Sequence, residues 1–278
     1  MKRLLGLLLG MSLLCAGINT VAAQEKSDGL TPPPKVLQVI REVLKPGKGG
    51  SPHVATESGF VKAFQAANWP THYLAVDSMS GPSRSLFFIS YDSFEAWEKD
   101  AKATEHNAAL SSALDRASIA DGDLLASIES STLVYREDYS LRAPVAIAQM
   151  RYFEVEVFKV KPGHEAEWDA LVKMYVSGYE KTMPDAHWAT YQSIYGADNG
   201  GMYVVFTPMK SLAEVDQNIA GMKKFMSDMG DDWMKKASAL AETCLQSSQN
   251  NLFAFNPKMS YVSDQWIKAD PSFWKPAQ

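Results

Sequence analysis

Two histidines are the strongest candidates for chemistry in this sequence. His72 and His187 are each followed by an aromatic residue, and each opens a run of residues typical of a β-strand. Histidine is the side chain most readily poised for proton transfer near neutral pH. The two rings could meet in one cavity, or one of them could ligate a haem iron. Alternatively, each ring hydrogen-bonds a nearby loop and has no part in chemistry.

Two glutamates form the second candidate site. Residues 152–160 alternate as a strand does, which places Glu154 and Glu156 on one face and only apolar side chains on the other. We expect the apolar face to meet helices, so that both carboxylates point to the opposite face of the sheet. Buried there, they would have raised pKa values and could act as acid or base. Alternatively, that face is solvated, or the glutamates pair with Arg136 or Arg151. In the corresponding earlier strand, residues 36–44, the same face carries Gln38, Ile40 and Glu42.

No other residues form a recognisable metal or catalytic motif. The acidic residues Asp228, Asp231 and Asp232 lack the alternating ligand pattern of a calcium loop. A glycine-rich phosphate loop, a G-x-S-x-G elbow and an H-E-x-x-H pair are all absent. The remaining histidines lie among polar residues and are expected at the surface: His53, His106 and His164. The sequence therefore predicts no metal and no cofactor, with haem kept as an alternative.

The N-terminus predicts export. Lys2 and Arg3 precede an apolar run over residues 4–17, and small residues end at Ala23, which is typical of a cleaved signal peptide over residues 1–23. The mature protein would then be periplasmic or extracellular. Cleavage removes Cys15 and leaves Cys244 alone, so no intrachain disulfide can form and we expect Cys244 to be a buried core thiol.

Composition excludes two classes of partner. The formal net charge is −5, and loss of the two basic residues of the signal peptide takes it to −7. Phosphate backbones need clustered Lys and Arg, so nucleic acid is not an expected partner. After cleavage the chain has no polybasic segment and no further apolar run of 18 residues, so we expect no membrane contact. A homo-oligomer is compatible with the sequence.

The elements that must position these residues occur twice, in the same order. The turn Lys45-Pro46-Gly47 is matched by Lys161-Pro162-Gly163, 116 residues later, and His72 is matched by His187, 115 residues later. Further landmarks follow at offsets of up to 119 residues, which argues for a tandem duplication of a domain-sized unit. The predicted organisation is a signal peptide at 1–23, a flexible lead-in at 24–34, repeat 1 at 35–140, a linker at 141–150, repeat 2 at 151–262 and an aromatic tail at 263–278.

Each copy predicts the order β-α-β-β-α-β, a ferredoxin-like unit of the α+β class. The first helices are expected over residues 56–67 and 165–181, and the strand pairs after them turn at residues 80–82 and 198–201. A second helical region of repeat 2 has an apolar stripe that we expect in the core: Leu212, Val215, Ile219, Met222, Met226, Met229 and Trp233. A sheet covered by helices on one face leaves the other face bare, so we expect the two sheets to pack together as an intrachain α+β barrel.

The opening of the second copy resembles the dimeric α+β barrel superfamily. Residues 160–168 run from a strand through Lys-Pro-Gly into an acidic helix start with Trp168, as in domains of the antibiotic-biosynthesis monooxygenase, NIPSNAP and EthD types. The first copy keeps the Lys-Pro-Gly turn but lacks the acidic start. The resemblance implies the fold. Its members include cofactor-free oxygenases, haem enzymes, isomerases and proteins without known chemistry, so it implies no single activity.

Three functions are compatible with the sequence. In the first, the protein binds or transforms a small apolar molecule between its two sheets, with His72, His187, Glu154 and Glu156 as the polar fixtures. In the second, it is a non-catalytic exported protein with a filled interior. In the third, it binds haem. Whether it is an enzyme stays open at this point.

Overall fold

The computed structural model describes residues 29–196 and 201–275, and the predicted signal peptide lies outside them. Eight strands form one closed antiparallel barrel in the order β1-β3-β2-β8-β5-β7-β6-β4, which confirms the predicted α+β barrel. The strands are β1 (Val36–Leu44), β2 (Tyr73–Ser78), β3 (Arg84–Tyr91), β4 (Leu125–Tyr135), β5 (Tyr152–Val160), β6 (Ala189–Gly196), β7 (Met202–Met209) and β8 (Leu245–Phe255).

Two strand pairs close the barrel between the halves of the chain. β2 pairs with β8 through Val76 and Phe255, and β4 pairs with β6 through Leu133 and Ser193. Each half therefore supplies four adjacent strands, and neither half leaves a sheet edge open. The interior of the barrel is shared by both halves.

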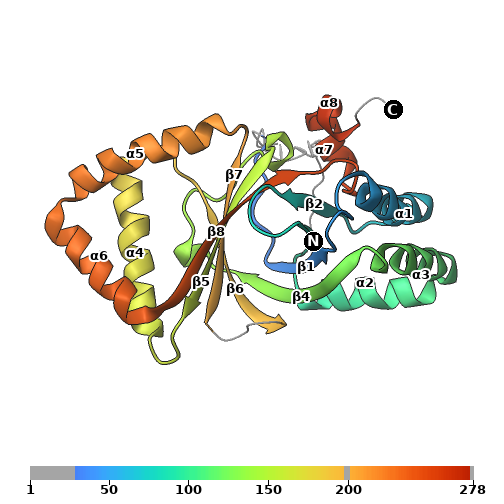
Figure 1. Cartoon of the computed structure of the whole chain (residues 1–278), viewed down its shortest axis with the longest axis horizontal. Helices are drawn as coiled ribbons and strands as arrows, with labels where there is room; N and C mark the ends of the chain where they lie inside the picture. Colours follow the sequence, from blue (N-terminus) through green and yellow to red (C-terminus); the bar gives the residue numbers. More distant parts are fainter. Residues whose placement is uncertain (1–28, 197–200, 276–278) are drawn as a thin grey trace, which may run out of the picture.

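The helices cover the outside of the barrel, with those of the two halves on opposite sides (Figure 1). The first half contributes α1 (Ser51–Ala67), α2 (Phe94–His106) and α3 (Ala108–Gly122), and the second contributes α4 (Glu165–Thr182), α5 (Ala213–Met229) and α6 (Asp231–Cys244). No helix of the described residues is long and apolar enough to cross a membrane.

The element order differs from the prediction at one place in each half. A pair of helices stands where one was expected, so the order is β-α-β-β-α-α-β. In the second half the break falls at Gly230, whose φ of 76° favours glycine. In the first half it falls at Asn107, whose side chain caps α3 by accepting a hydrogen bond from the backbone N–H of Leu110. Helix α1 also begins five residues earlier than predicted, at Ser51.

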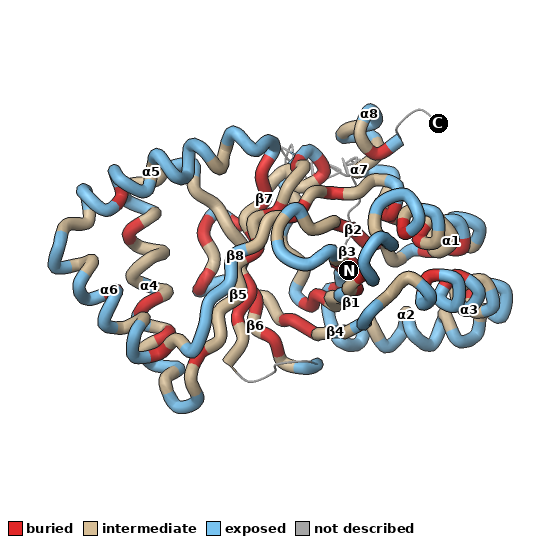
Figure 2. Tube along the Cα trace, viewed as in Figure 1, coloured by how far each residue is buried: buried red, intermediate tan, exposed pale blue. Residues whose placement is uncertain are grey.

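The buried residues concentrate in the barrel and under the helices (Figure 2). One end of the barrel is closed by the C-terminal tail, which includes α7 (Asp264–Ala269) and α8 (Pro271–Trp274). Trp274 is 5% exposed, packs in the barrel core and donates its indole N–H to the carbonyl of Ala148 at 2.7 Å. The aromatic tail is therefore part of the folded body, as its composition predicts.

Most of the predicted apolar stripe of the second half is exposed, contrary to the sequence prediction, although Trp233 packs against a buried cluster. Ile219 is 66% exposed, and Leu212, Met222 and Met226 are also exposed. Phe225, outside the predicted stripe, is the buried residue of α5. The prediction failed for these residues because α5 lies on the outside of α4, and its contacts with α4 and α6 leave part of its apolar surface uncovered.

Candidate functional site

Four ionisable side chains meet between the sheet and the helices of the first half. Glu42 comes from β1, His53 and Glu57 lie one turn apart on α1, and Asp121 comes from the end of α3. All four are buried, with residue exposures between 1% and 6%. Ionisable groups are rarely buried together unless they are paired, share protons or coordinate a cation.

The ring of His53 lies at the centre of this acidic cluster. Its Nε2 atom lies 3.0 Å from Glu42 Oε2, 3.5 Å from Asp121 Oδ1 and 4.0 Å from Glu57 Oε1. One ligand atom of each residue falls within 4.8 Å of all the others. The cluster is thus compact enough for a single small ion or a shared proton to contact every member.

A second layer of hydrogen bonds orients the cluster. Ser85 Oγ lies 3.4 Å from His53 Nδ1 and donates to Asp77 Oδ1 at 2.5 Å. Asp77 also accepts from the side-chain amide of Asn256 at 2.6 Å. On the other side, the hydroxyl of Thr56 lies 2.6 Å from Asp121 Oδ1. Neighbours on three elements therefore hold the side chains in place.

Two buried polar atoms beside the cluster have no hydrogen-bond partner. They are Glu57 Oε1 and the hydroxyl of Tyr73 on β2. Burial, with the nearby charges of Glu42, Asp121 and Asp77, raises the pKa of Glu57 to about 9. Burial also raises the pKa of Glu42 and that of Tyr73, so the Tyr73 phenol keeps its proton. An unpaired buried polar group lowers the stability of the fold, so a bound ligand or ion that pairs with these atoms would be stabilising.

The two residues that carry these unpaired atoms line a cavity of about 390 Å³ between the sheet and the helices. Glu42, Glu57 and Tyr73 line one part of it, and most of the remaining wall is aromatic or aliphatic. The apolar wall comprises Ile40, Phe60, Phe64, Trp69, Phe87, Ile89 and Leu114. We call this space the cleft. A mostly apolar cavity with a few convergent polar groups is the usual form of a small-molecule site.

Asp100, also in the wall of the cleft, shows what a satisfied carboxylate looks like in the same place. Its Oδ1 accepts from the indole N–H of Trp69 at 2.9 Å and from the hydroxyl of Thr71 at 2.6 Å, and its Oδ2 accepts from the hydroxyl of Tyr91 at 3.0 Å. Asp100 thus fixes the wall, whereas Glu57 keeps an oxygen free for another partner.

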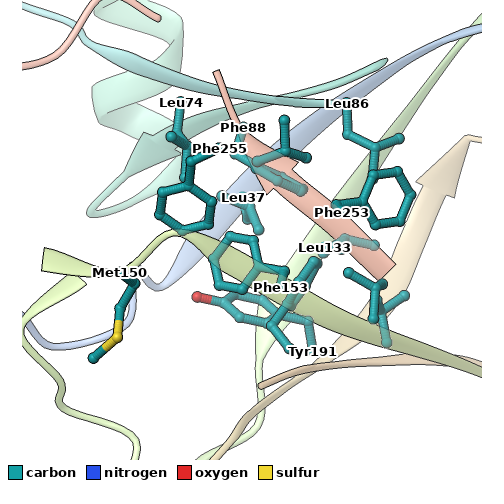
Figure 3. Close-up of a cluster of buried hydrophobic side chains, with 14 of the residues drawn as sticks. Leu37, Leu74, Leu86, Phe88, Leu133, Met150, Phe153, Tyr191, Phe253 and Phe255 are labelled. Atoms are coloured by element: carbon teal, nitrogen blue, oxygen red, sulfur yellow. The ribbon is translucent and has the colours of Figure 1, made fainter. Parts of the chain in front are cut away.

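A second cavity of about 330 Å³ lies inside the barrel. Its apolar wall includes Phe88, Leu133 and Phe253, and Figure 3 shows these side chains converging from strands of both halves. Arg41, Arg84, Glu129 and Lys159 also line it, from the ends of their strands opposite the C-terminal tail. Arg41 forms an ion pair with Glu129. The second of the three sequence hypotheses requires a filled interior. The barrel does not meet that requirement, because it contains this cavity.

The predicted orientation of the strand glutamates was wrong. Phe153, Val155 and Val157 face the barrel interior, and Glu156 lies on the outer face under α4. Burial and the neighbouring Glu154 raise the pKa of Glu156 to about 7. Glu154 hydrogen-bonds the side chain of Asn250. The prediction assigned the apolar face of the strand to the helices. In the closed barrel the interior is less accessible to water than the face under the helices, so the apolar side chains point inward.

The same inversion applies to the first strand. Gln38, Ile40 and Glu42 were expected to face the interior, yet Val39 and Arg41 line the barrel cavity and Glu42 lies in the buried cluster under α1. The alternative in which Glu154 and Glu156 pair with the two arginines is also wrong. Arg136 pairs with Asp138 and Arg151 pairs with Asp270.

The two predicted histidines do not meet in either cavity. His72 stacks on Tyr261 with ring centroids 4.8 Å apart, and burial lowers its pKa. His187 lies between two backbone carbonyls, with Nδ1 3.0 Å from Asp185 O and Nε2 2.9 Å from Pro208 O. Neither residue lines the cleft or the barrel cavity. Among residues 29–196 and 201–275, no histidine lines either cavity, so the donors present there do not fit a histidine-ligated haem.

The residues that do converge in the buried cluster were not predicted from the sequence. His53 was expected at the surface but is 1% exposed, because α1 begins before it and turns its ring toward β1. The usable signal was the spacing of His53 and Glu57, four residues apart on one helical face, beneath a strand that carries Glu42. Asp121 had no local signal, since it reaches the cluster through tertiary packing of α3 on α1.

Comparison with known proteins supports the fold alone. No protein-family model matches the chain, and no curated protein does. A solved structure titled as an anthrone oxidase-like protein superposes with a TM-score of 0.53 at 17% identity, covering 82% of this chain and 94% of that one. A candidate monooxygenase from Lactobacillus acidophilus gives 0.48 at 8% identity, covering 80% and 94%. A chlorite dismutase variant from Candidatus Nitrospira defluvii gives 0.47 at 8%, covering 85% and 95%. The chain has the dimeric α+β barrel type of fold, with both halves of the barrel in one polypeptide.

Proposed function

We propose that the protein binds a small, largely apolar molecule in the cleft of the first half, with its one polar group turned toward Tyr73 and the acidic cluster. The observation that carries this proposal is the pair of unpartnered buried atoms, Glu57 Oε1 and Tyr73 Oη, at one end of an apolar cavity. A bound molecule that hydrogen-bonds either atom removes a desolvation penalty that the protein otherwise keeps.

The lining of the cleft restricts the class of ligand. The walls are rich in aromatic rings, including Phe60, Phe64 and Trp69, which favours a flat aromatic or alicyclic body. Tyr73 is a neutral hydroxyl and can donate one hydrogen bond to an oxygen of the ligand. The carboxyl groups of Glu42 and Glu57 disfavour an anionic head group and favour a neutral hydroxyl or carbonyl. This places the ligand class close to small phenols, quinones and ketones.

A neutral bicyclic phenol, 1-naphthol, is a suitable probe for the test. Titration calorimetry on the mature chain should show one binding site. Leu114→Trp fills the cleft and should abolish the heat of 1-naphthol binding. Val204→Phe fills the barrel cavity instead and should leave the heat of binding unchanged. Tyr73→Phe removes one hydrogen bond and should weaken binding by roughly 2- to 10-fold. Equal loss with Val204→Phe, or unchanged binding with Leu114→Trp, would contradict the assignment to the cleft.

The barrel cavity is a second candidate site, favoured by one specific feature. Three basic side chains and one acidic side chain line it, namely Arg41, Arg84, Lys159 and Glu129. The guanidinium of Arg84 lies over the ring of Phe253 at 5.0 Å from its centroid and donates to Asn251 at 2.6 Å. Such a lining suits a small apolar molecule with an anionic end. 1-Naphthoate distinguishes the two sites, because it should bind the barrel and avoid the acidic cleft.

We further propose that the mature protein is exported after removal of residues 1–23. The proposal rests on the basic start, apolar run and small residues of the N-terminus. Intact mass spectrometry of protein recovered from the exported fraction should give a chain that begins at Gln24. A chain that retains Met1 would contradict cleavage. The absorption spectrum of the same sample tests the haem alternative, which requires a Soret band.

A further inference from the structure

We infer that Glu42, His53, Glu57 and Asp121 form a binding site for one divalent transition-metal ion. The inference concerns the polar end of the cleft and uses the geometry of the four side chains, so it stands whether or not 1-naphthol binds. It rests on three independent observations: the spacing of the ligand atoms, the hydrogen bonding of the His53 ring, and the unpartnered oxygen of Glu57.

The spacing of the ligand atoms matches the coordination sphere of a small ion. With ligand distances of about 2.1 Å, neighbouring ligands of an octahedral ion are about 3.0 Å apart and opposite ones about 4.2 Å. From His53 Nε2, the three carboxylate oxygens lie at 3.0, 3.5 and 4.0 Å. All three separations fall within this range, and every pair of the four ligand atoms lies within 4.8 Å, so one ion can contact them after side-chain shifts of a few tenths of an ångström.

The hydrogen bonds of the His53 ring leave Nε2 available as a ligand. Ser85 uses its hydroxyl proton on Asp77 at 2.5 Å, so toward His53 Nδ1 it can only accept. A proton on Nδ1 satisfies that contact, so Nε2 is the nitrogen that faces the acidic cluster. Nε2 lies 3.0 Å from Glu42 Oε2, and a proton or a cation can join these two atoms. Histidine ligands of metals are commonly held in this way by an acceptor on their other nitrogen.

The charge of the cluster also favours a cation. Glu57 Oε1 is buried and unpaired, and its cluster holds two further buried carboxylates, those of Glu42 and Asp121. A divalent ion placed among these oxygens balances their negative charge and gives Glu57 Oε1 a partner. A ligand set of one imidazole and three carboxylates suits Zn²⁺, Mn²⁺ or Fe²⁺ better than Ca²⁺ or Mg²⁺.

The side of the ion that faces the cleft would be open to a ligand. Glu42 and Glu57 lie both in the cluster and in the wall of the cavity. An ion held by them could therefore contact the polar group of a molecule in the cleft and polarise a hydroxyl or carbonyl oxygen there. This arrangement turns the proposed binding site into one that can also perform chemistry.

The test uses the mature full chain, stripped with EDTA and dialysed. Titration calorimetry with Zn²⁺ and with Mn²⁺ should give one ion per chain, and the melting temperature should rise with added ion. His53→Gln and Glu57→Gln should each weaken binding by at least about tenfold, and Ser85→Ala by roughly 10- to 100-fold through loss of the support to His53. Glu156→Gln alters a half-buried carboxylate of the second half and serves as the matched control, with unchanged metal affinity.

Two results would overturn the inference. One is the absence of both heat and thermal shift with either ion in the stripped wild-type chain. The other is equal affinity in wild type, His53→Gln and Ser85→Ala, which would place the ion elsewhere. Circular dichroism checks that each variant folds, and Ser85→Ala, which leaves all four ligands in place, keeps the test decisive if His53→Gln does not fold. Because 1-naphthol binding is measured separately on stripped protein, a failure of metal binding is distinguishable from a failure of the cleft as a ligand site.

Discussion

The two halves of the barrel carry the same elements but bury different chemistry beneath their helices. In the first half, Glu42 on β1 lies beside Ser85 on β3 and faces His53 and Glu57. At the corresponding register in the second half, Phe158 on β5 pairs with Tyr203 on β7. Helix α4 brings Trp168 against both rings, with centroids 5.3 and 4.9 Å away.

The difference shows that the fold does not require a polar layer. Aromatic packing fills the space in the second half, where Trp168, Tyr203 and Cys244 belong to one buried cluster. The first half instead buries carboxylates in the same layer, and buried carboxylates lower the stability of a fold unless they are paired. We therefore assign packing to the second half and ligand chemistry to the first. The following predictions test that division, beginning with the largest expected effect.

The aromatic layer should dominate stability and leave binding untouched. Trp168 is 3% exposed, and Trp168→Ala should lower the free energy of unfolding by about 3 to 5 kcal/mol, because it leaves a large cavity. Urea denaturation measures the change. Binding of 1-naphthol and of Zn²⁺ to the folded variant should match wild type. A loss of either in a folded Trp168→Ala chain would break the division between the halves.

The half-buried carboxylate Glu156 of the second half should destabilise the fold as pH rises. Because the folded pKa of Glu156 is about 7, above its usual value of 4.5, the folded state holds the proton more tightly than the unfolded state. Stability from this group is present below about pH 4.5 and is lost as pH rises to 7. Glu156→Gln should therefore gain about 2 kcal/mol relative to wild type between pH 5 and pH 8. Denaturation curves at both pH values measure it, and an equal difference at both would show that Glu156 is solvated.

Removing a carboxylate from the first-half cluster should have the opposite sign to removing an aromatic ring from the second. In metal-stripped protein at pH 8, Glu57→Gln keeps the shape of the side chain and removes a group whose raised pKa costs stability above its usual value of 4.5. We expect a gain of about 1 kcal/mol in the free energy of unfolding. Thermal and urea denaturation report it. A loss of several kcal/mol would mean that Glu57 is a structural partner within the cluster.

The exposed stripe of α5 should contribute least. Ile219 is 66% exposed, so Ile219→Ala should change stability by no more than about 0.5 kcal/mol. The same denaturation assay applies, with Phe225→Ala as the buried control on the same helix. A large loss at Ile219 would show that the stripe is covered in solution, for example by a second copy of the chain.

Local sequence patterns were sufficient for the architecture. The two Lys-Pro-Gly turns and the strand alternation predicted two similar units and a shared barrel, and the solitary Cys244 was expected in the core, where it is fully buried. Such patterns report periodicity within one element, and the repeated order of elements then predicts two sheets that cover each other.

The candidate site could not be predicted in the same way. Alternation shows that Glu154 and Glu156 share a face of the strand. It does not show which face becomes the less solvent-accessible one when the barrel closes. His53 and Asp121 are 68 residues apart in the sequence and meet only because α3 packs on α1. The helix predicted from residue 56 excluded His53, which concealed its spacing to Glu57. Polar clusters of this kind depend on long-range packing that a single sequence does not display.

The central claim is that ligand binding belongs to the cleft of the first half. A crystal structure of the mature protein grown with 1-naphthol tests it most directly. We predict density for one molecule between the sheet and α1, with its oxygen within hydrogen-bond distance of Tyr73 Oη or Glu57 Oε1. Density confined to the barrel cavity, with the cleft free of ligand, would contradict the claim.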